Sequence, residues 1–233
     1  MKDLNNLSLK NNTIYSKGYT SESYSFINFF LKKHKNIKSF LDIGCGDGVL
    51  LKLISKKIDY LGVDADVGIK RKKKHSKIKY FKSANKTELF LKNLNKKYDC
   101  VALMNVLEHT DTFLKLFFIA LKKSKKYVLV ALPNEDNFLS RIRFLQGKGI
   151  LTHGLDMIDK KPGHKHQWFI QFNAASQLLK TNAKNYKFNL LNTLYFIQHP
   201  KNYLKRIVYK FLTFFVSRQT QMQCFCLVFK KDD

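Results

Sequence analysis

Three glycines at alternate positions, Gly44, Gly46 and Gly48, follow directly on an apolar run. The run from Ile37 to Ile43 is too short for a helix of its own and ends at glycine, which is typical of a buried parallel strand. Glycine lets the backbone take positive φ and lets a ligand approach bare N–H groups at the start of a helix. The stretch therefore predicts a strand, a turn and a helix N-terminus that suit a nucleotide-like cofactor.

Two carboxylates are in register with this turn. Asp42 lies two residues before Gly44, and Asp64 lies twenty residues after it, at the end of a second apolar strand, residues 60–63. An acid at the end of the second strand can accept both hydroxyls of a ribose. A dinucleotide-binding G-x-G-x-x-G loop requires a third glycine where this chain has Val49, and it has no use for Asp42. A carboxylate at Asp42 suits a cofactor with a cationic amino acid part.

The segment 41–48, LDIGCGDG, resembles motif I of the class I S-adenosylmethionine-dependent methyltransferases. Residues 98–110 are similar to the fourth strand and following segment of the branch that contains ubiquinone-biosynthesis O-methyltransferases and many small-molecule and sugar methyltransferases. Residues 127–134 resemble the fifth strand of that branch. The resemblance implies an enzyme with S-adenosylmethionine as its cofactor. The implied cofactor-binding residues are Asp42, Gly44, Cys45, Gly46, Asp64, Ala65 and Asn105.

The composition indicates one domain and an anionic partner. The chain has 233 residues, which suits a single large domain with one core. Its first twelve residues are polar and lack the apolar stretch of a signal peptide, and its four cysteines lack paired metal spacing, so we expect a reduced, cytoplasmic protein. The 43 basic and 17 acidic residues give a formal charge of +26. This excess implies attraction to RNA, a membrane surface or a phosphorylated substrate.

Strand and helix signals alternate along the chain, which predicts an α/β fold with a Rossmann-like, doubly wound sheet. We expect seven strands, mostly parallel, with an antiparallel last strand as in the family that the chain resembles. After the strands at 37–43 and 60–63, strands are expected at 78–81, 98–104, 127–132, 188–197 and 221–230. Helices are expected at 21–33, 48–56, 69–75, 88–94, 113–122 and 173–181.

We expect a single methyltransferase domain over residues 1–233, with an N-terminal helical segment at 1–36, a lid-like insertion at 134–168 and a helical insertion at 200–218. The lid follows the carboxyl end of a strand, where ligands bind in such sheets, and includes a short helix at 138–145. In the third segment, one helical face carries Leu204, Ile207, Val208, Phe211, Leu212 and Phe215. We expect this face to pack on the sheet or the lid, although the composition also permits membrane-surface binding.

Methyl transfer from a sulfonium is an in-line displacement at carbon, so a hydroxyl acceptor must be held collinear with the donor and lose its proton. The candidate catalytic bases are His109, His164 and His166, because imidazole titrates near neutral pH. His109 could instead tie a loop, as Leu-Glu-His turns often do in the resembled branch. In the ubiquinone O-methyltransferases a Glu-x-x-Glu-His run is associated with a divalent metal. Here Asn105 replaces the first Glu and leaves Glu108 and His109, so we assign no metal ligands.

The main hypothesis is O-methylation of a small molecule or of a sugar in a cell-surface glycan. The fourth strand is not followed by the Asn-Pro-Pro-aromatic clamp of base amino-methyltransferases, and no cysteine nucleophile of the cytosine type follows a proline. The alternative is an RNA methyltransferase, which the charge alone supports. A third hypothesis, a non-catalytic methyltransferase-like binding protein, conflicts with the unaltered glycine loop. The expected partner is thus a small-molecule or glycan acceptor, with nucleic acid not favoured and peripheral contact with an anionic membrane left open.

Overall fold

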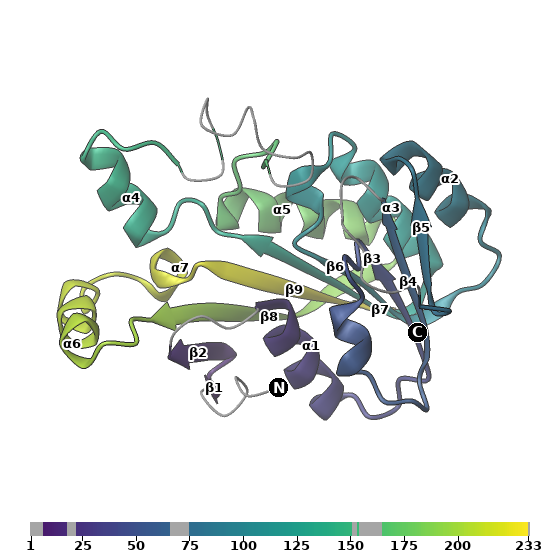
Figure 1. Ribbon diagram of the computed structural model, residues 1–233, viewed down its shortest axis with the longest axis horizontal. Coiled ribbons are helices and arrows are strands. Elements are labelled where there is room, and N and C mark those ends of the chain that lie inside the picture. The colour runs from purple at the N-terminus through teal and green to yellow at the C-terminus, as the bar shows by residue number, and fades with distance from the viewer. Residues whose placement is uncertain (1–6, 18–21, 66–74, 151–152, 154–164, 233) are drawn as a thin grey trace.

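The computed structural model describes residues 7–17, 22–65, 75–150, 153 and 165–232. Within them, nine strands form one sheet in the order β1-β2-β8-β9-β7-β6-β3-β4-β5 (Figure 1). The strands are β1 (Leu7–Lys10), β2 (Thr13–Lys17), β3 (Ser39–Ile43), β4 (Asp59–Ala65), β5 (Ile78–Phe81), β6 (Tyr98–Met104), β7 (Ser124–Pro133), β8 (Phe188–His199) and β9 (Cys224–Lys231). In the part of the sheet with the order β7-β6-β3-β4-β5, all neighbouring strands are parallel, and β9 is antiparallel to both β7 and β8. The predicted α/β class, the mostly parallel sheet and the antiparallel last strand are confirmed.

The N-terminal segment accounts for the difference from the seven predicted strands. Residues 1–36 were predicted to be helical, but β1 and β2 form a hairpin ahead of helix α1 (Glu22–Lys33). Asn11 and Asn12 have φ of 48° and 60°, as tight two-residue hairpin turns require. Strand β2 then pairs in parallel with five residues of β8 and so covers an edge that would otherwise be open. The Asn-Asn pair was the sequence signal for this hairpin.

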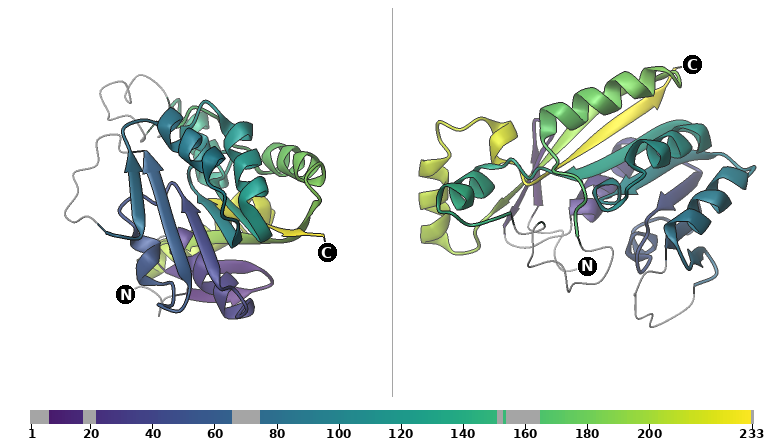
Figure 2. Two further views of the ribbon diagram at one scale, coloured as in Figure 1. Left: turned by 90° about the vertical axis from the view of Figure 1, so that its right-hand side faces the viewer. Right: turned by 90° about the horizontal axis from the view of Figure 1, so that it is seen from above.

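Helices cover both faces of the sheet (Figures 1 and 2). On one face lie α2 (Ala84–Asn93), α3 (Phe113–Lys123) and α5 (Phe172–Lys184), with Phe117 and Leu179 in the core beneath them. On the other face lie α1 and the short 3-10 helix η2 (Val49–Lys52), with Phe26 and Phe30 fully buried or nearly so. The two cores hold the sheet between them. Because the strands from β7 to β5 are parallel, their carboxyl ends share one edge of the sheet, where ligand sites of such folds lie.

Two helices were predicted between β3 and β5. The helix expected at 48–56 is wrong, because only the four residues of η2 are helical there. Gly48 offers no side chain to cap a longer helix, and the Ser55 hydroxyl accepts a hydrogen bond from the Lys57 N–H at 3.3 Å, which favours a turn. The helix expected at 69–75 lies outside the described residues except for His75, which is not helical.

The helical insertion at 200–218 departs from the expectation in how it packs. It contains α6 (Tyr203–Leu212) and is followed by the short α7 (Arg218–Gln221). The expected packing of its apolar face on the sheet or lid is wrong, since Phe211 is 78% exposed and Phe215 is 91% exposed. The helix is instead held through Tyr209 and Thr213, which are both buried.

Helix α4 (Phe138–Leu145), which has the predicted bounds, lies at the same end of the molecule as α6 (Figures 1 and 2). Within the predicted lid, residues 151–152 and 154–164 lie outside the described part of the chain. Among the described residues, no helix combines the length and the apolar character needed to cross a membrane.

Candidate active site

The glycine turn has the backbone geometry that the sequence predicted. Gly44, Gly46 and Gly48 have φ of 75°, 53° and 69°, values that L-residues rarely adopt. A Cβ atom at Gly44 would lie 2.3 Å from Cγ2 of Val106, so this glycine lets the turn pack against the segment after β6. A Cβ atom at Gly46 would meet nothing within 4 Å. Gly46 therefore borders open space in which a ligand can approach the backbone.

Asp64 lies beside this open space. Its Oδ2 accepts a hydrogen bond from the Gly46 N–H at 2.6 Å, and the Tyr80 hydroxyl donates to the Gly46 carbonyl at 3.1 Å. The loop is thus tied to β4 and β5, the two strands at this edge of the sheet. The structure brings the predicted glycine and the predicted ribose acid together, as binding of a nucleoside requires.

Asp42 is the buried acid beneath the loop. It is fully buried and accepts a hydrogen bond from the Tyr60 hydroxyl at 2.7 Å, while its Oδ1 has no hydrogen-bond partner among the described residues. Burial raises the pKa of Asp42 to about 7, against the lowering effect of the Tyr60 hydrogen bond and with a smaller raising effect from Asp64. A buried carboxyl with an unsatisfied oxygen fits a cofactor that carries a positive charge.

The remaining predicted cofactor residues lie around this loop. Cys45 is buried and packs against Gly62, where a Cβ would lie 2.9 Å from its sulfur. Ala65 is the last residue of β4. Asn105 follows β6 with φ of 55°, and its Oδ1 accepts a weak hydrogen bond from the Cys224 thiol at 3.5 Å. The roles of these residues toward a cofactor stay predictions.

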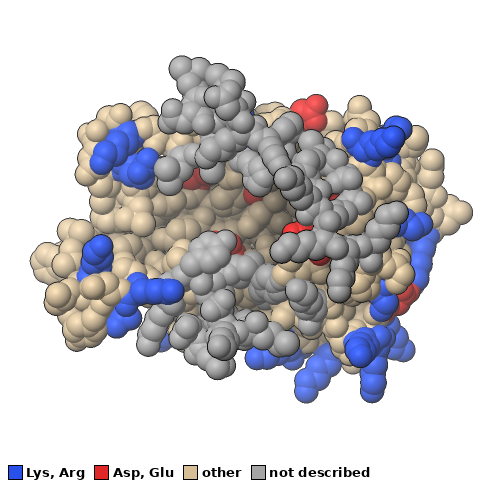
Figure 3. Space-filling view, viewed as in Figure 1, with Lys and Arg blue, Asp and Glu red and all other residues tan. Residues whose placement is uncertain are grey.

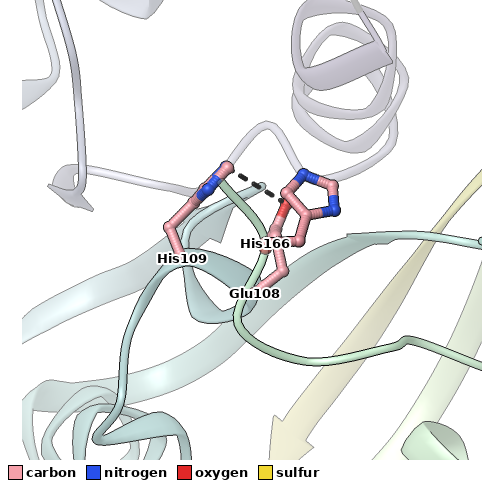
Figure 4. A group of neighbouring side chains, drawn as sticks. All are labelled: Glu108, His109 and His166. Atoms are coloured by element: carbon pink, nitrogen blue, oxygen red, sulfur yellow. Dashed lines mark ion pairs between the residues drawn. The ribbon is translucent and has the colours of Figure 1, made fainter. Parts of the chain in front are cut away.

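A second group of polar side chains lies after β6, in the 3-10 helix η3 (Leu107–His109). Glu108 is 1% exposed, and burial, with a contribution from Glu135, raises its pKa to about 8. His109 Nε2 lies 3.9 Å from Glu108 Oε1, and the rings of His109 and His166 are 4.7 Å apart (Figure 4). The structure therefore joins two of the three predicted catalytic histidines. His164 lies outside the described residues.

Glu135 organises the other side of this group and was missed in the sequence. Its Oε1 lies 2.7 Å from His166 Nδ1 and 2.8 Å from His153 Nε2, and its Oε2 accepts a hydrogen bond from the Ile170 N–H at 2.7 Å. Glu135 is buried two residues after the end of β7. An acid just past the carboxyl end of a parallel strand was the signal that could have found it.

The end of the predicted lid is docked on η3. The Gln167 N–H donates to the Glu108 carbonyl at 2.8 Å, and the Trp168 indole donates to the Thr110 carbonyl at 2.6 Å. His109 Nδ1 lies 3.2 Å from the Lys165 carbonyl. These contacts place His166 opposite Glu108, although the two residues are 58 positions apart in the sequence.

The same side chains form two sets that could hold a metal ion. One set is Glu108, His109 and His166, and the other is Glu135, His153 and His166; within each set the ligand atoms lie within 4.8 Å of one another. One carboxylate with two imidazoles suits a divalent transition metal. Glu108 Oε2 is buried and has no hydrogen-bond partner among the described residues, which fits a missing ligand contact. No metal ligands were predicted from the sequence, because Asn105 stands where the Glu-x-x-Glu-His run has its first Glu; in the structure His166 joins Glu108 and His109 instead.

The chain is similar in fold to several methyltransferases of known structure. It resembles a SAM-dependent methyltransferase from Archaeoglobus fulgidus, with 19% identity, 89% of this chain and 94% of that chain covered, and a TM-score of 0.58. The methyltransferase domain of bacterial CtHen1-C gives 16% identity, coverage of 91% and 98%, and a TM-score of 0.57. Magnesium protoporphyrin IX methyltransferase (ChlM) from Synechocystis PCC 6803 with bound SAH gives 12% identity, coverage of 91% and 83%, and a TM-score of 0.53.

These similarities concern the fold, and the family follows from the sequence itself. No curated protein matches the chain significantly. A family model described as a methyltransferase domain matches residues 17–182, which is more than half of the chain and includes the glycine turn, η3, Glu135 and His166. The predictions of a methyltransferase and of an enzyme are confirmed, and the chain belongs to the methyltransferase domain family.

Proposed function

We propose that this methyltransferase uses S-adenosylmethionine to methylate a hydroxyl oxygen of a small polar acceptor, such as a sugar of a cell-surface glycan. One observation carries the proposal. Glu108 and His109 follow β6, His166 joins them from the segment at 165–170, and Val106, between β6 and Glu108, packs against Gly44 of the cofactor loop. A proton acceptor and the cofactor loop are therefore neighbours at one edge of the sheet.

The cofactor fits the loop on three counts. Gly46 leaves open space above its backbone, Asp64 can exchange its hydrogen bond with Gly46 for ribose hydroxyls, and buried Asp42 can balance a positive charge. S-adenosylmethionine, when bound, supplies an electrophilic methyl group. The structures with bound SAH or SAM among those similar to this chain, such as ChlM, support this choice of cofactor.

His166 is the best placed base. The Glu135 carboxylate can only accept hydrogen bonds, so His166 Nδ1 carries the proton at the 2.7 Å contact between them. This fixes the tautomer and leaves the lone pair on Nε2 to accept the proton of a hydroxyl acceptor. Glu108 and His109 face the same space and can orient the acceptor hydroxyl. A divalent ion held by Glu108, His109 and His166 would lower the pKa of that hydroxyl instead.

An RNA acceptor is supported less well. The charge of +26 favours polyanions, yet the functional edge of the sheet carries the carboxylates of Asp64 and Glu135. In the space-filling view acidic atoms lie mainly near the centre of this face and basic atoms mainly toward its ends (Figure 3). An acidic site repels phosphates and suits a neutral, hydroxyl-rich acceptor better.

The proposal is tested with methyl-labelled S-adenosylmethionine and three substrate pools: nucleotide-sugars, isolated glycans and total RNA. We expect label in a sugar-containing product, with mass spectrometry placing the methyl group on oxygen. The matched variant His166→Asn should bind the cofactor but transfer little label, and His75→Asn, which changes an exposed histidine before β5, serves as the control. Label in RNA alone would refute the proposed acceptor, and no binding of S-adenosylmethionine would refute the proposed cofactor.

A further inference from the structure

The end of the molecule that carries α6 has an unusual number of exposed apolar side chains. They lie on α6, on the two phenylalanines after it and at the end of α4. We call this set the apolar platform: Leu204 (70% exposed), Ile207 (48%), Val208 (56%), Phe211 (78%), Leu212 (51%), Phe214 (77%), Phe215 (91%), Phe144 (71%) and Leu145 (86%). Single exposed apolar residues are ordinary, but a cluster such as the one on α6 and directly after it marks a binding surface.

The orientation of α6 is fixed by its opposite side. Tyr209 is buried, its ring packs at 5.5 Å on His199, and Thr213 is buried at the helix end. The Gln221 side chain donates to the carbonyls of Thr213 and Val216, at 3.0 and 2.7 Å, and so holds the chain after the helix. Because successive residues turn about 100° around a helix, Phe211 points nearly opposite to Tyr209. The platform therefore faces away from the fold.

Basic side chains border the apolar arc of α6. On the same helical projection Lys205 falls beside Leu212 and Lys210 beside Tyr203, at the two borders of the arc, and both lysines are exposed. Long basic side chains at such borders can reach outward while their carbon chains lie against apolar groups. This is the pattern of helices that lie in the interface of a membrane.

The surroundings of the platform are mainly basic, although Asp136, just before α4, forms an ion pair with Arg141 at 2.9 Å. Residues 200–221 contain five Lys or Arg and no Asp or Glu, and residues 138–149 contain three and none. In Figure 3 the basic atoms over α4 and over α6 appear at the same end of the face. The Asn134 side chain ties the start of the α4 segment to α7, donating to the Gln219 and Met222 carbonyls at 3.0 and 3.1 Å. The segment that leads into α4 is thus tied to α7, which follows α6 in the chain.

We propose that the apolar platform binds the surface of an anionic lipid bilayer, with α6 lying in the interface. Anionic headgroups complement the basic border, and the acyl region accepts the aliphatic and aromatic arc. A second copy of the chain would bring two basic ends together, which is repulsive. RNA would use the basic groups and can stack on Phe211 at the centre of the arc, but the arc also carries Leu204, Ile207 and Val208, which cannot stack on bases and which an acyl region accepts. The inference does not depend on the identity of the methyl acceptor.

The experiment is sedimentation of the full chain with vesicles at physiological salt. We expect binding to vesicles of equal parts phosphatidylglycerol and phosphatidylcholine that is at least about tenfold tighter than to phosphatidylcholine alone. The double variant Phe211→Ser and Phe215→Ser should weaken binding by about tenfold or more, because two exposed rings no longer insert. The control Leu89→Ser changes an exposed leucine on α2, and it should bind like the original chain. Circular dichroism confirms that each variant is folded.

Several results would overturn the proposal. One is no binding of the original chain to either kind of vesicle. Another is unchanged binding of the double phenylalanine variant, which would show attraction by charge alone. Light scattering and RNA titration of the same proteins test the other possible partners. If the original chain does not bind vesicles but forms a dimer or an RNA complex, and the double variant does not, the platform would belong to that partner instead.

Discussion

The cofactor half and the acceptor half of the functional edge are built in different ways. The cofactor loop joins adjacent strands β3, β4 and β5 and is shaped by backbone conformation at three glycines. The acceptor half joins η3, the residue pair after β7 and a distant segment at 165–170, and is shaped by side-chain contacts among Glu108, Glu135 and His166. The first half should therefore respond to changes in backbone space, and the second to changes in charge and protonation.

Substitutions in the two halves should differ most in their effects on turnover and on cofactor affinity. His166→Ala should lower turnover about 10²- to 10⁴-fold, because it removes the proposed base, while cofactor affinity stays nearly unchanged. Glu135→Gln should lower turnover less and change the pH profile, since the amide can also donate and no longer fixes the tautomer of His166. Steady-state rates and calorimetric titration with S-adenosylmethionine check both variants, with and without a chelator. Equal losses of turnover and of cofactor affinity would contradict the separation.

Within the loop, substitutions at two glycines should impair the protein for different reasons. Gly46→Val meets no neighbouring atom, so its cost in stability should be limited to the strain of a β-branched residue at a φ of 53°, roughly 1–3 kcal/mol. Cofactor affinity should fall roughly 100-fold, about 2.7 kcal/mol. Gly44→Val would collide with Val106 and should destabilise the fold itself. Calorimetric titration and thermal unfolding distinguish the two. A Gly46→Val protein with unchanged affinity would place the cofactor elsewhere.

Glu108 gives the acceptor half a pH-dependent stability. Its pKa is raised from 4.5 to about 8, so its contribution is fully present below about pH 4.5 and is lost as the pH rises through 8. Glu108→Gln removes the buried charge and should raise the free energy of unfolding at pH 9, by on the order of 1–3 kcal/mol. Denaturant unfolding at pH 5 and pH 9 measures the change.

Glu88 is a second buried glutamate, whose effect on stability should depend on pH in the opposite direction to that of Glu108. Although burial raises its pKa, hydrogen bonds from Lys115 and Thr112 hold the pKa below the ordinary value. Its stabilising contribution is therefore present above the unfolded pKa and lost as the pH falls, so Glu88→Gln should destabilise the protein at neutral pH. The same sign of change for both variants at pH 9 would mean that the surroundings of Glu108 are misassigned.

The smallest expected effect is the pH dependence of cofactor binding. Asp42 has a pKa of about 7, and a cationic cofactor favours its charged form. Affinity for S-adenosylmethionine should fall as the pH drops below 7, by up to about tenfold per pH unit. Titrations at pH 6 and pH 8 measure this, and in Asp42→Asn the difference should disappear. A constant affinity of the original protein over this range would show that Asp42 does not sense the cofactor charge.

The sequence by itself determined the cofactor half. Gly44, Gly46 and Asp42 are neighbours in the chain, and Asp64 is the last but one residue of the next strand, which pairs with the first. Local periodicity was also enough for most of the parallel strands and for α4, whose bounds match the expectation. These features depend on short-range patterns, so the order of residues already contains them.

Only the tertiary structure decided the acceptor half and the apolar platform. Glu135 meets His166 because β6 and β7 are adjacent and the chain returns over η3, a path that no local pattern encodes. The apolar face of α6 looked like a core face, because a helical stripe is the same whether the fold or a membrane covers it. The packing of Tyr209 and Thr213 turned that stripe outward. Such choices depend on contacts between segments that are far apart in the chain, and these are settled by the packing of the whole fold.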